Sequence, residues 1–329
     1  PPFPYTTLFR SGPDMKTPLE RPTLLLMLLL GPAGLGSVHA DVAISADDGT
    51  IEVHASSKPV LTYHTETVTP PDGMDEVYSR SGFIHPVYSP SGKVLSDDFP
   101  VGHAHQHALF SAWTRATFKH EVVDFWNQQG GTGSSAHRDT VEIGESCFTV
   151  DLLQSSNQNG PAIRERWAIN VEDSSDPFVF DIEIEQECAT DEEVYIHPYH
   201  YGGFGFRGSA LWNSEDERRF EGAMKVLTSD GIMDIEESNH TRPRWVAVYG
   251  PIGGTDAGLV IMNHPTSFRH PQPVRVHPVM PYFVFSPAVA GSFILRPGMA
   301  YKANYRIVTF DGAPDAARIE RWYEEYVRE

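Results

Sequence analysis

Histidine is the residue type whose number and spacing in this sequence point most directly to chemistry. The 329 residues include 15 histidines, and His103, His105 and His107 occupy alternate positions of one short segment. In a strand, such spacing places three imidazoles on one face. Three neighbouring imidazoles can bind a divalent transition metal ion or supply a general acid/base pair near neutral pH. Histidines that only hydrogen-bond to a substrate or close turns give the same pattern, so these alternatives stay open.

Further candidates are histidines, aromatic residues and arginines elsewhere in the chain. His200 lies in the segment Ile196-His197-Pro198-Tyr199-His200-Tyr201 and is expected to be a fourth catalytic residue. Aromatic rings stack on the C–H faces of sugars, and planar donors bind hydroxyls or a carboxylate. The expected substrate-binding residues are His85, Trp126, Asn127, His137, Tyr201, Arg207, His264, Arg275 and His277.

Other motifs are weaker. Residues 203–208, Gly-Phe-Gly-Phe-Arg-Gly, match the dinucleotide-binding pattern in letters, but no helix is expected after them. We therefore expect the glycines to permit close backbone approach or a bulge in a strand. The sequence contains no G-x-S-x-G, P-loop or H-E-x-x-H segment. A carboxylate pair for glycoside hydrolysis stays an alternative, because Glu165, Glu183 and Asp124 could reach a cleft.

Elements that could position these residues are mostly strands. The 27 glycines and 26 prolines favour short strands joined by turns. Within residues 178–187, Phe178, Phe180, Ile182 and Ile184 alternate with Asp181, Glu183 and Glu185, which indicates a strand with one wet face. The expected strands are 51–54, 60–67, 140–153, 162–171, 178–188, 245–249, 258–262, 282–285, 292–295 and 301–310.

The carboxyl end has the period of a helix. Ile319, Trp322, Tyr323 and Tyr326 are spaced i, i+3, i+4 and i+7 after Pro314. The predicted fold is therefore all-β, an antiparallel β-sandwich with a C-terminal helix.

The amino-terminal residues are set apart from this fold. Residues 1–14 resemble the translation of a sequencing adaptor, and residues 15–40 resemble a secretory signal peptide with a basic start, an apolar run and the small-residue end Val38-His39-Ala40. Residues 41–329 are predicted to form a single β-sandwich domain that is exported to the periplasm or the extracellular space. No other run approaches the roughly 18 apolar residues of a membrane helix.

Charge and cysteine content limit the partners. The formal net charge is -19, and polyanions are bound by excess Lys and Arg, so nucleic acid is not an expected partner. A small molecule or oligosaccharide is the expected ligand, without membrane insertion of the mature chain. Cys147 and Cys188 are the only cysteines. In an exported protein they form either a disulfide bridge or two separate buried thiols.

Several blocks resemble a known family. They are Phe83-Ile84-His85-Pro86-Val87-Tyr88, the residues 102–110, Val123-Asp124-Phe125-Trp126-Asn127, the residues 257–265, Val274-Arg275-Val276-His277-Pro278, Met280-Pro281-Tyr282-Phe283 and Leu295-Arg296-Pro297-Gly298. Together these blocks resemble a bacterial family of unknown function that carries the label "methane oxygenase PmoA", or PmoA-like. Many members have H-P-H-H-R-G where this chain has residues 103–108. The roles of Gln106 and His107 are therefore the least transferable from the family.

The resemblance implies a β-sandwich akin to the galactose mutarotase-like supersandwich, and relatives often occur in secreted carbohydrate-degrading systems. It does not imply methane oxidation, because the membrane subunit of that name has several spanning helices, and nothing here supplies an oxidant or electrons. The expected function is a histidine-lined pocket that acts on a carbohydrate by acid/base or metal-assisted chemistry, as a lyase, hydrolase or isomerase. The alternatives are a non-catalytic carbohydrate-binding module and a structural protein, whose histidines would not converge.

Overall fold

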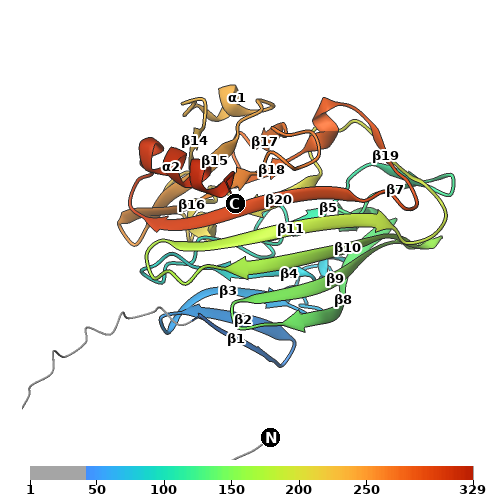
Figure 1. Ribbon diagram of the computed structural model, residues 1–329, viewed down its shortest axis with the longest axis horizontal. Helices are drawn as coiled ribbons and strands as arrows, with labels where there is room; N and C mark the ends of the chain where they lie inside the picture. The colour runs from blue at the N-terminus through green and yellow to red at the C-terminus, as the bar shows by residue number, and fades with distance from the viewer. Residues whose placement is uncertain (1–41, 329) are drawn as a thin grey trace, which may run out of the picture. The chain divides into compact units, whose positions relative to one another are not determined.

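Three antiparallel sheets make up the computed structural model, which describes residues 42–328; the two predicted amino-terminal segments, 1–14 and 15–40, lie outside the described residues. The first sheet has the order β1 (Val42–Asp47), β2 (Thr50–Ala55), β3 (Lys58–His64), β4 (Phe83–Val87), β5 (Leu109–Ala112), β13 (Gly203–Arg207), β18 (Tyr282–Phe285) and β17 (Val274–Val276). The second sheet has the order β14 (Lys225–Thr228), β15 (Trp245–Ile252), β16 (Thr255–Asn263), β20 (Tyr301–Asp311), β11 (Phe178–Cys188), β10 (Gly160–Val171), β9 (Cys147–Ser156) and β8 (Gly133–Ile143). Figure 1 shows β20, β11, β10, β9 and β8 side by side.

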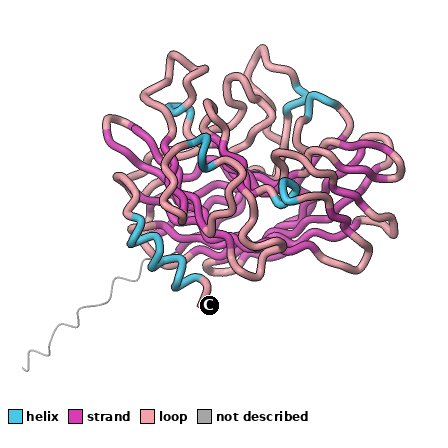
Figure 2. Tube along the Cα trace, turned by 90° about the horizontal axis from the view of Figure 1, so that it is seen from above, coloured by secondary structure: helices cyan, strands magenta, loops and turns pink. Residues whose placement is uncertain are grey.

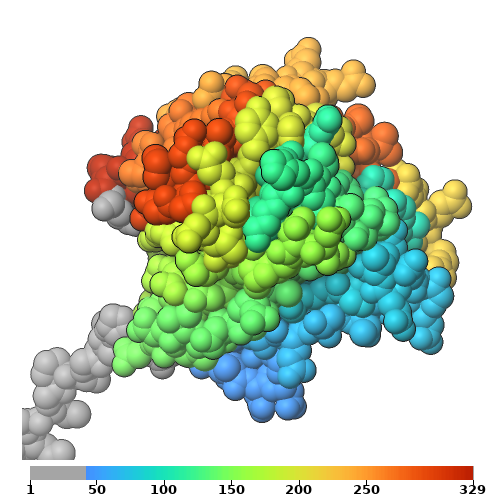
Figure 3. Space-filling model, turned by 90° about the vertical axis from the view of Figure 1, so that its right-hand side faces the viewer, coloured from blue at the N-terminus to red at the C-terminus, as the bar shows by residue number. Residues whose placement is uncertain are grey.

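The third, small sheet has the order β19 (Phe293–Leu295), β12 (Val194–Ile196), β6 (Ala116–Phe118) and β7 (Glu121–Val123). Its strands come from distant parts of the sequence, and their segments lie side by side in Figure 3. The helices are α1 (Ile235–Ser238) and α2 (Ala316–Tyr326), and the short 3-10 turns are η1 (Glu76–Tyr78), η2 (Gln128–Gly130), η3 (Ala210–Trp212) and η4 (Pro287–Ala290).

The main core lies between the first and second sheets. Tyr63 of β3 contacts the ring of Trp167 of β10, and Phe204 of β13 stacks on Tyr305 of β20 with ring centroids 4.6 Å apart. Phe178, Phe180, Ile182 and Ile184 are all buried, as the alternation in β11 predicts. The predicted antiparallel β-sandwich is therefore confirmed.

Helix α2 covers the outer face of the second sheet. It begins after Asp315, whose carboxylate accepts hydrogen bonds from the backbone N–H groups of Ala317 and Arg318. Ile319, Tyr323 and Tyr326 are buried in a second apolar cluster with residues of β15, β16 and β20. The predicted C-terminal helix is confirmed, and Figure 2 shows it on the side of the sheets opposite to the long loops. Within residues 42–328, neither helix has the length and apolar character needed to cross a bilayer.

Two details correct or settle sequence expectations. The segment 140–153 is not one strand, because β8 ends at Ile143 and a turn closed by the Gly144 N–H and the Cys147 carbonyl leads into β9. Cys147 and Cys188 are separate thiols. They pair with Asn170 and Ile163 of β10 respectively, so they lie near opposite ends of that strand, roughly 23 Å apart along it, too far for a bridge.

We expect the Ile319→Ala variant to lower the free energy of unfolding by about 3 kcal/mol, because the substitution leaves a cavity between α2 and the second sheet. Arg321 is exposed on the opposite face of the same helix. The Arg321→Ala control should change stability by less than about 0.5 kcal/mol. Denaturant unfolding of both variants measures the difference, and equal stabilities would contradict the packing described.

Candidate functional site

The candidate site begins with the register of the first sheet. Phe204 and Phe206 point toward the second sheet, so the intervening positions Gly205 and Arg207 point to the opposite, outer face. Gly205 pairs with Val284, which in turn pairs with Arg275, and Arg207 pairs with Tyr282. Cross-strand partners share a face. Arg207, Arg275 and Tyr282 therefore lie together on the outer face.

Trp126 forms the layer above these strands. A Cβ on Gly205 would lie 2.7 Å from the Trp126 ring, so only glycine permits this approach. The indole is fully buried against Phe110 and Tyr201, with ring centroids 4.4 and 5.5 Å away. This is the close backbone approach expected of the glycines in residues 203–208. Those residues form β13 and a turn, and only the short η3 follows them.

A pocket of about 300 Å³ opens beside this layer. Four separate parts of the chain line it: the loop of residues 101–108, the segment around η2, the segment before β13, and the strands β17 and β18. The lining residues are His103, His105, Gln106, Asn127, Gln129, His200, Tyr201, Arg275, His277 and Tyr282. Histidines from residues 85–107 thus meet histidines from residues 197–277, which argues against a purely structural protein.

The histidine segment is a pair of turns and not a strand. Backbone hydrogen bonds from His103 to Pro100 and from Gln106 to His103 close these turns. His103 and His105 face the pocket, with ring centroids 5.6 Å apart, whereas His107 is fully buried beside Phe83 and Phe99. The expectation that all three imidazoles share one face is therefore wrong.

His107 joins two loops of the site. Its Nδ1 lies 2.6 Å from Asp98 Oδ1, and its Nε2 lies 3.0 Å from Gln128 Oε1. The Gln128 amide nitrogen donates to the Val77 and Ser79 carbonyls, so its oxygen faces His107 as an acceptor. Both ring nitrogens of His107 are therefore occupied by protein oxygens, and neither is free to bind a metal ion or to reach a ligand.

Arg207 lies beneath the pocket. Its side chain is fully buried, and Nη1 donates to Gln106 Oε1 at 2.9 Å. Nε and Nη2 have no hydrogen-bond partner within the described residues. Burial lowers the pKa of Arg207 to about 10, against the charges of Asp97 and Glu215. Arg207 remains charged at neutral pH and holds Gln106 at the pocket wall.

Tyr201 and Asn127 form part of the opposite wall. The Tyr201 hydroxyl donates to Asn127 Oδ1 at 3.1 Å, and Asn127 Nδ2 donates to Asp124 at 2.8 Å. Asp124 also accepts the backbone N–H groups of Trp126 and Asn127. Its carboxylate therefore shapes this turn, and burial raises the pKa of the Tyr201 hydroxyl well above 10.

The orientation of His277 is fixed by its own backbone turn. Its Nδ1 accepts the N–H groups of Val279 and Met280, so the mobile proton resides on Nε2. The His277 ring lies 5.7 Å from that of His103 and 5.3 Å from that of Tyr282, measured between centroids. His103 Nδ1 is buried without a partner in the described part of the chain.

The pocket histidines are neutral at physiological pH. Burial, followed by the charges of neighbouring histidines and arginines, lowers the pKa of His105 to about 3. Burial and then Arg275 lower the pKa of His277 to about 4. Burial also lowers the pKa of His103 and of His200. Neutral imidazoles have a free lone pair, so they can accept a proton from a bound molecule.

Comparison with known families supplies an assignment. A model of the family described as "Family of unknown function (DUF6807)" matches residues 50–324. The chain belongs to this family. A search of curated proteins finds no similar sequence.

Solved structures similar to this DUF6807 chain have low TM-scores. Heparan sulfate lyase HepC from Pedobacter heparinus is 10% identical, with a TM-score of 0.36 over 84% of this chain and 36% of the lyase. A galactose mutarotase related enzyme from Lactobacillus acidophilus is 8% identical, with a TM-score of 0.36 over 83% of this chain and 99% of that one. GH36 alpha-galactosidase AgaB from Geobacillus stearothermophilus is 8% identical, with a TM-score of 0.37 over 82% and 41%. The chain spans about a third of the lyase's length.

Several expected site residues of the DUF6807 chain lie elsewhere. His137 lies in the edge strand β8 and is hydrogen-bonded to the Tyr63 hydroxyl. His264 is hydrogen-bonded to Thr266, and its ring contacts Tyr326 of α2. His85 bonds to Ser96 and does not line the pocket. Trp126 and Arg207 are buried beneath the lining. Spacing alone could not separate these histidines, because each is placed by the sheet that carries it.

The donor set does not fit the expected three-histidine metal site. Both nitrogens of His107 are occupied, and among residues 42–328 no three His, Cys, Asp or Glu side chains form a group that could hold an ion.

The carboxylates considered for glycoside hydrolysis do not form a pair. Glu165 accepts hydrogen bonds from Trp167 and Gln154 in the core, and Glu183 is exposed on β11.

The residues that sequence reasoning missed are Gln106, Gln129 and Tyr282. Tyr282 and Gln106 lie in blocks that the family resemblance contains, but only strand register and the bond to Arg207 bring them to the pocket. Gln129 lies in η2, two residues after Asn127. Nothing in its sequence context distinguishes it from an ordinary surface glutamine.

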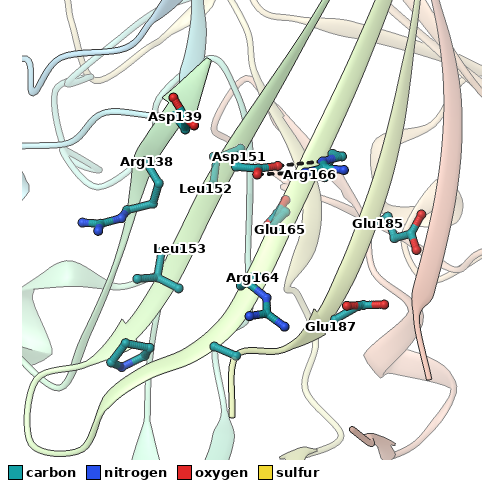
Figure 4. Close-up of a pocket in the computed structure, with 12 residues that line it drawn as sticks. Arg138, Asp139, Asp151, Leu152, Leu153, Arg164, Glu165, Arg166, Glu185 and Glu187 are labelled. Carbon is teal, nitrogen blue, oxygen red and sulfur yellow. Dashed lines mark hydrogen bonds and ion pairs between the residues drawn. The ribbon is translucent and has the colours of Figure 1, made fainter. Parts of the chain in front are cut away.

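A second cavity of about 530 Å³ lies on the outer face of the second sheet. Figure 4 shows its charged side chains along the strands, with Asp151 and Arg166 joined by hydrogen bonds of 2.7 and 2.9 Å. Its described lining contains no aromatic residue and no histidine. It is a solvated, internally paired face and a weaker candidate for sugar recognition.

We expect the His107→Ala variant to lose about 3 kcal/mol of unfolding free energy, because it leaves the nearly buried Asp98 carboxylate and Gln128 Oε1 unpaired. The His105→Ala variant should cost less, since His105 lines the pocket and contacts the ring of His103, so its loss leaves no buried carboxylate unpaired. Denaturant unfolding compares the two. Equal losses would mean that His107 does not hold the loops together.

The lowered pKa values of the histidines also give a stability prediction. Because the ordinary pKa is 6.5 and the folded pKa of His105 is about 3, the unfolded chain binds more protons between these values. The contribution of His105 to stability is complete above pH 6.5 and is lost as the pH falls toward 3. The His105→Gln variant should lose stability less steeply between pH 6.5 and 4 than the wild type. Urea unfolding at several pH values measures the slopes, and identical slopes would refute this account.

Proposed function

We propose that the pocket of this DUF6807 protein binds a carbohydrate or a similar polyhydroxylated molecule and that its histidines act on it as acid/base catalysts. The supporting observation is the convergence of His103 and His105 with His200 and His277 beside Tyr201. Neutral imidazoles are suited to accept protons, and the amides of Gln106 and Asn127 are suited to bind hydroxyls. The aromatic ring of Tyr201 offers a stacking surface.

Roles follow from these placements. In this proposal His103, His105 and His200 contact the ligand, and His277 and Tyr282 form the opposite wall. His107 is a positioning residue that acts through Asp98 and Gln128. We also infer that the family is the PmoA-like one that the blocks around His85, His103 and Trp126 resemble, and that the chain is exported.

A turnover assay tests the proposal. The purified protein is incubated with panels of neutral and acidic oligosaccharides, and products are followed as new reducing ends and by NMR. If a substrate turns over, the His105→Gln variant should lower kcat by about 100-fold or more, the usual contribution of a general acid or base. The His54→Gln control, in β2 at the far end of the first sheet, should retain activity.

Binding without turnover would favour the carbohydrate-binding module instead. In that outcome the Tyr201→Ala variant should weaken binding in a calorimetric titration, while His54→Gln should not. If no sugar binds, or if binding is unaffected by His105 and Tyr201, the proposal is wrong.

A further inference from the structure

The charges around the pocket differ in sign from those of the whole chain. The sequence has 44 acidic and 25 basic residues. Yet among the ten described residues that line the pocket, one is an arginine, Arg275, and none is Asp or Glu. Arg207 adds a second cation immediately beneath Gln106. The pocket therefore presents positive charge in an acidic protein.

The nearby carboxylates lie outside the pocket lining, and Arg219 pairs with two of them. Arg219 Nη1 lies 3.8 Å from Asp97 Oδ1, and Arg219 also pairs with Asp216. Burial raises the pKa of Asp97 to about 6, so this carboxylate is ionised at neutral pH, and its charge acts on both Arg207 and Arg219. Glu215 lies behind the loop at Gly102, where a Cβ would meet its carboxylate, and not in the lining. Arg207 keeps two nitrogens without a partner in the described part of the chain.

The histidines respond to the same field. Burial is the first cause of the lowered pKa of His103, His105, His200 and His277. The charge of Arg207 adds to it at His103, where Glu215 opposes it, and at His105 and His277. The charge of Arg275 adds to it at His200 and His277. An anion placed among them would be stabilised by both arginines.

From these observations we propose that the ligand is an acidic sugar, a uronate, whose carboxylate is bound by Arg275 while the amides and Tyr201 bind its hydroxyls. This inference rests on the proposed function and specifies its substrate class. Among the described lining residues Arg275 is the one Lys or Arg, and guanidinium binds carboxylate through paired hydrogen bonds. The volume of about 300 Å³ is at the lower end of ligand pockets and suits one or two sugar residues.

Matched pairs of ligands test the charge. Oligosaccharides of glucuronate, galacturonate, mannuronate and guluronate are compared with their neutral methyl esters by calorimetric titration. At least one acid should bind 10-fold or more tightly than its ester, since hydrogen bonds from a guanidinium to a carboxylate are stronger than those to a neutral ester. The Arg275→Gln variant should abolish this preference, and Arg275→Lys should retain part of it.

The Arg164→Gln variant is the matched control, because Arg164 is an exposed arginine in the cavity of the second sheet. It should leave the preference unchanged. If esters bind as tightly as acids and binding still depends on His105 and Tyr201, the uronate inference is overturned while the proposed function stands. If no sugar in the panel binds, both are overturned.

A second measurement does not depend on an arginine variant that folds. NMR titration of the wild-type histidine side chains should show that bound uronate raises the pKa of His105 or His277, because the carboxylate offsets the nearby cations. The methyl ester should not raise it. A uronate that binds without raising either pKa would place its carboxylate elsewhere and overturn the inference.

Discussion

The buried contact among Asp98, His107 and Gln128 is the constraint on which the site depends. Both ring nitrogens of His107 have a hydrogen-bond partner, Asp98 Oδ1 for Nδ1 and Gln128 Oε1 for Nε2. The loop of residues 101–108 and the segment around η2 are thereby joined at one imidazole. His105 and Gln106 precede it, and Asn127 and Gln129 flank its partner. One histidine with both nitrogens hydrogen-bonded thus fixes the separation of two pocket walls that share no strand.

The first sheet supplies the other half of the arrangement through its period of two. Phe204 and Phe206 fill the core between the sheets, so Gly205 and Arg207 must face outward. The absence of a side chain at Gly205 admits Trp126, and Trp126 supports Tyr201. The five residues of β13 therefore determine both the core packing on one face and the electrostatics of the pocket on the other. A one-residue shift of register would turn Arg207 into the core between the sheets and Phe204 to the outer face.

Sequence reasoning was most successful where a single period governs a whole element. The alternation in residues 178–188 and the helical spacing from Ile319 to Tyr326 each predict the observed element, because burial of one face decides both. It failed at His107, because residues 101–106 form turns whose geometry has no period. It also could not separate His277 from His264, which have the same proline-rich context but lie on different sheets. Proximity that comes from register and loop closure is not encoded in local spacing.

Charge connects the pocket's architecture to its chemistry. His105 stays neutral first because burial penalises its charged form, and then because protonation would add a positive charge near other histidines and Arg207. That keeps a lone pair available, but it also makes His105 a weak base. A bound anion would reverse part of this effect by offsetting the charge of Arg207, so His105 would become a stronger base when the proposed ligand is present. Recognition of the carboxylate and activation of the imidazole would then depend on Arg275 and Arg207 respectively, and a neutral sugar would gain neither.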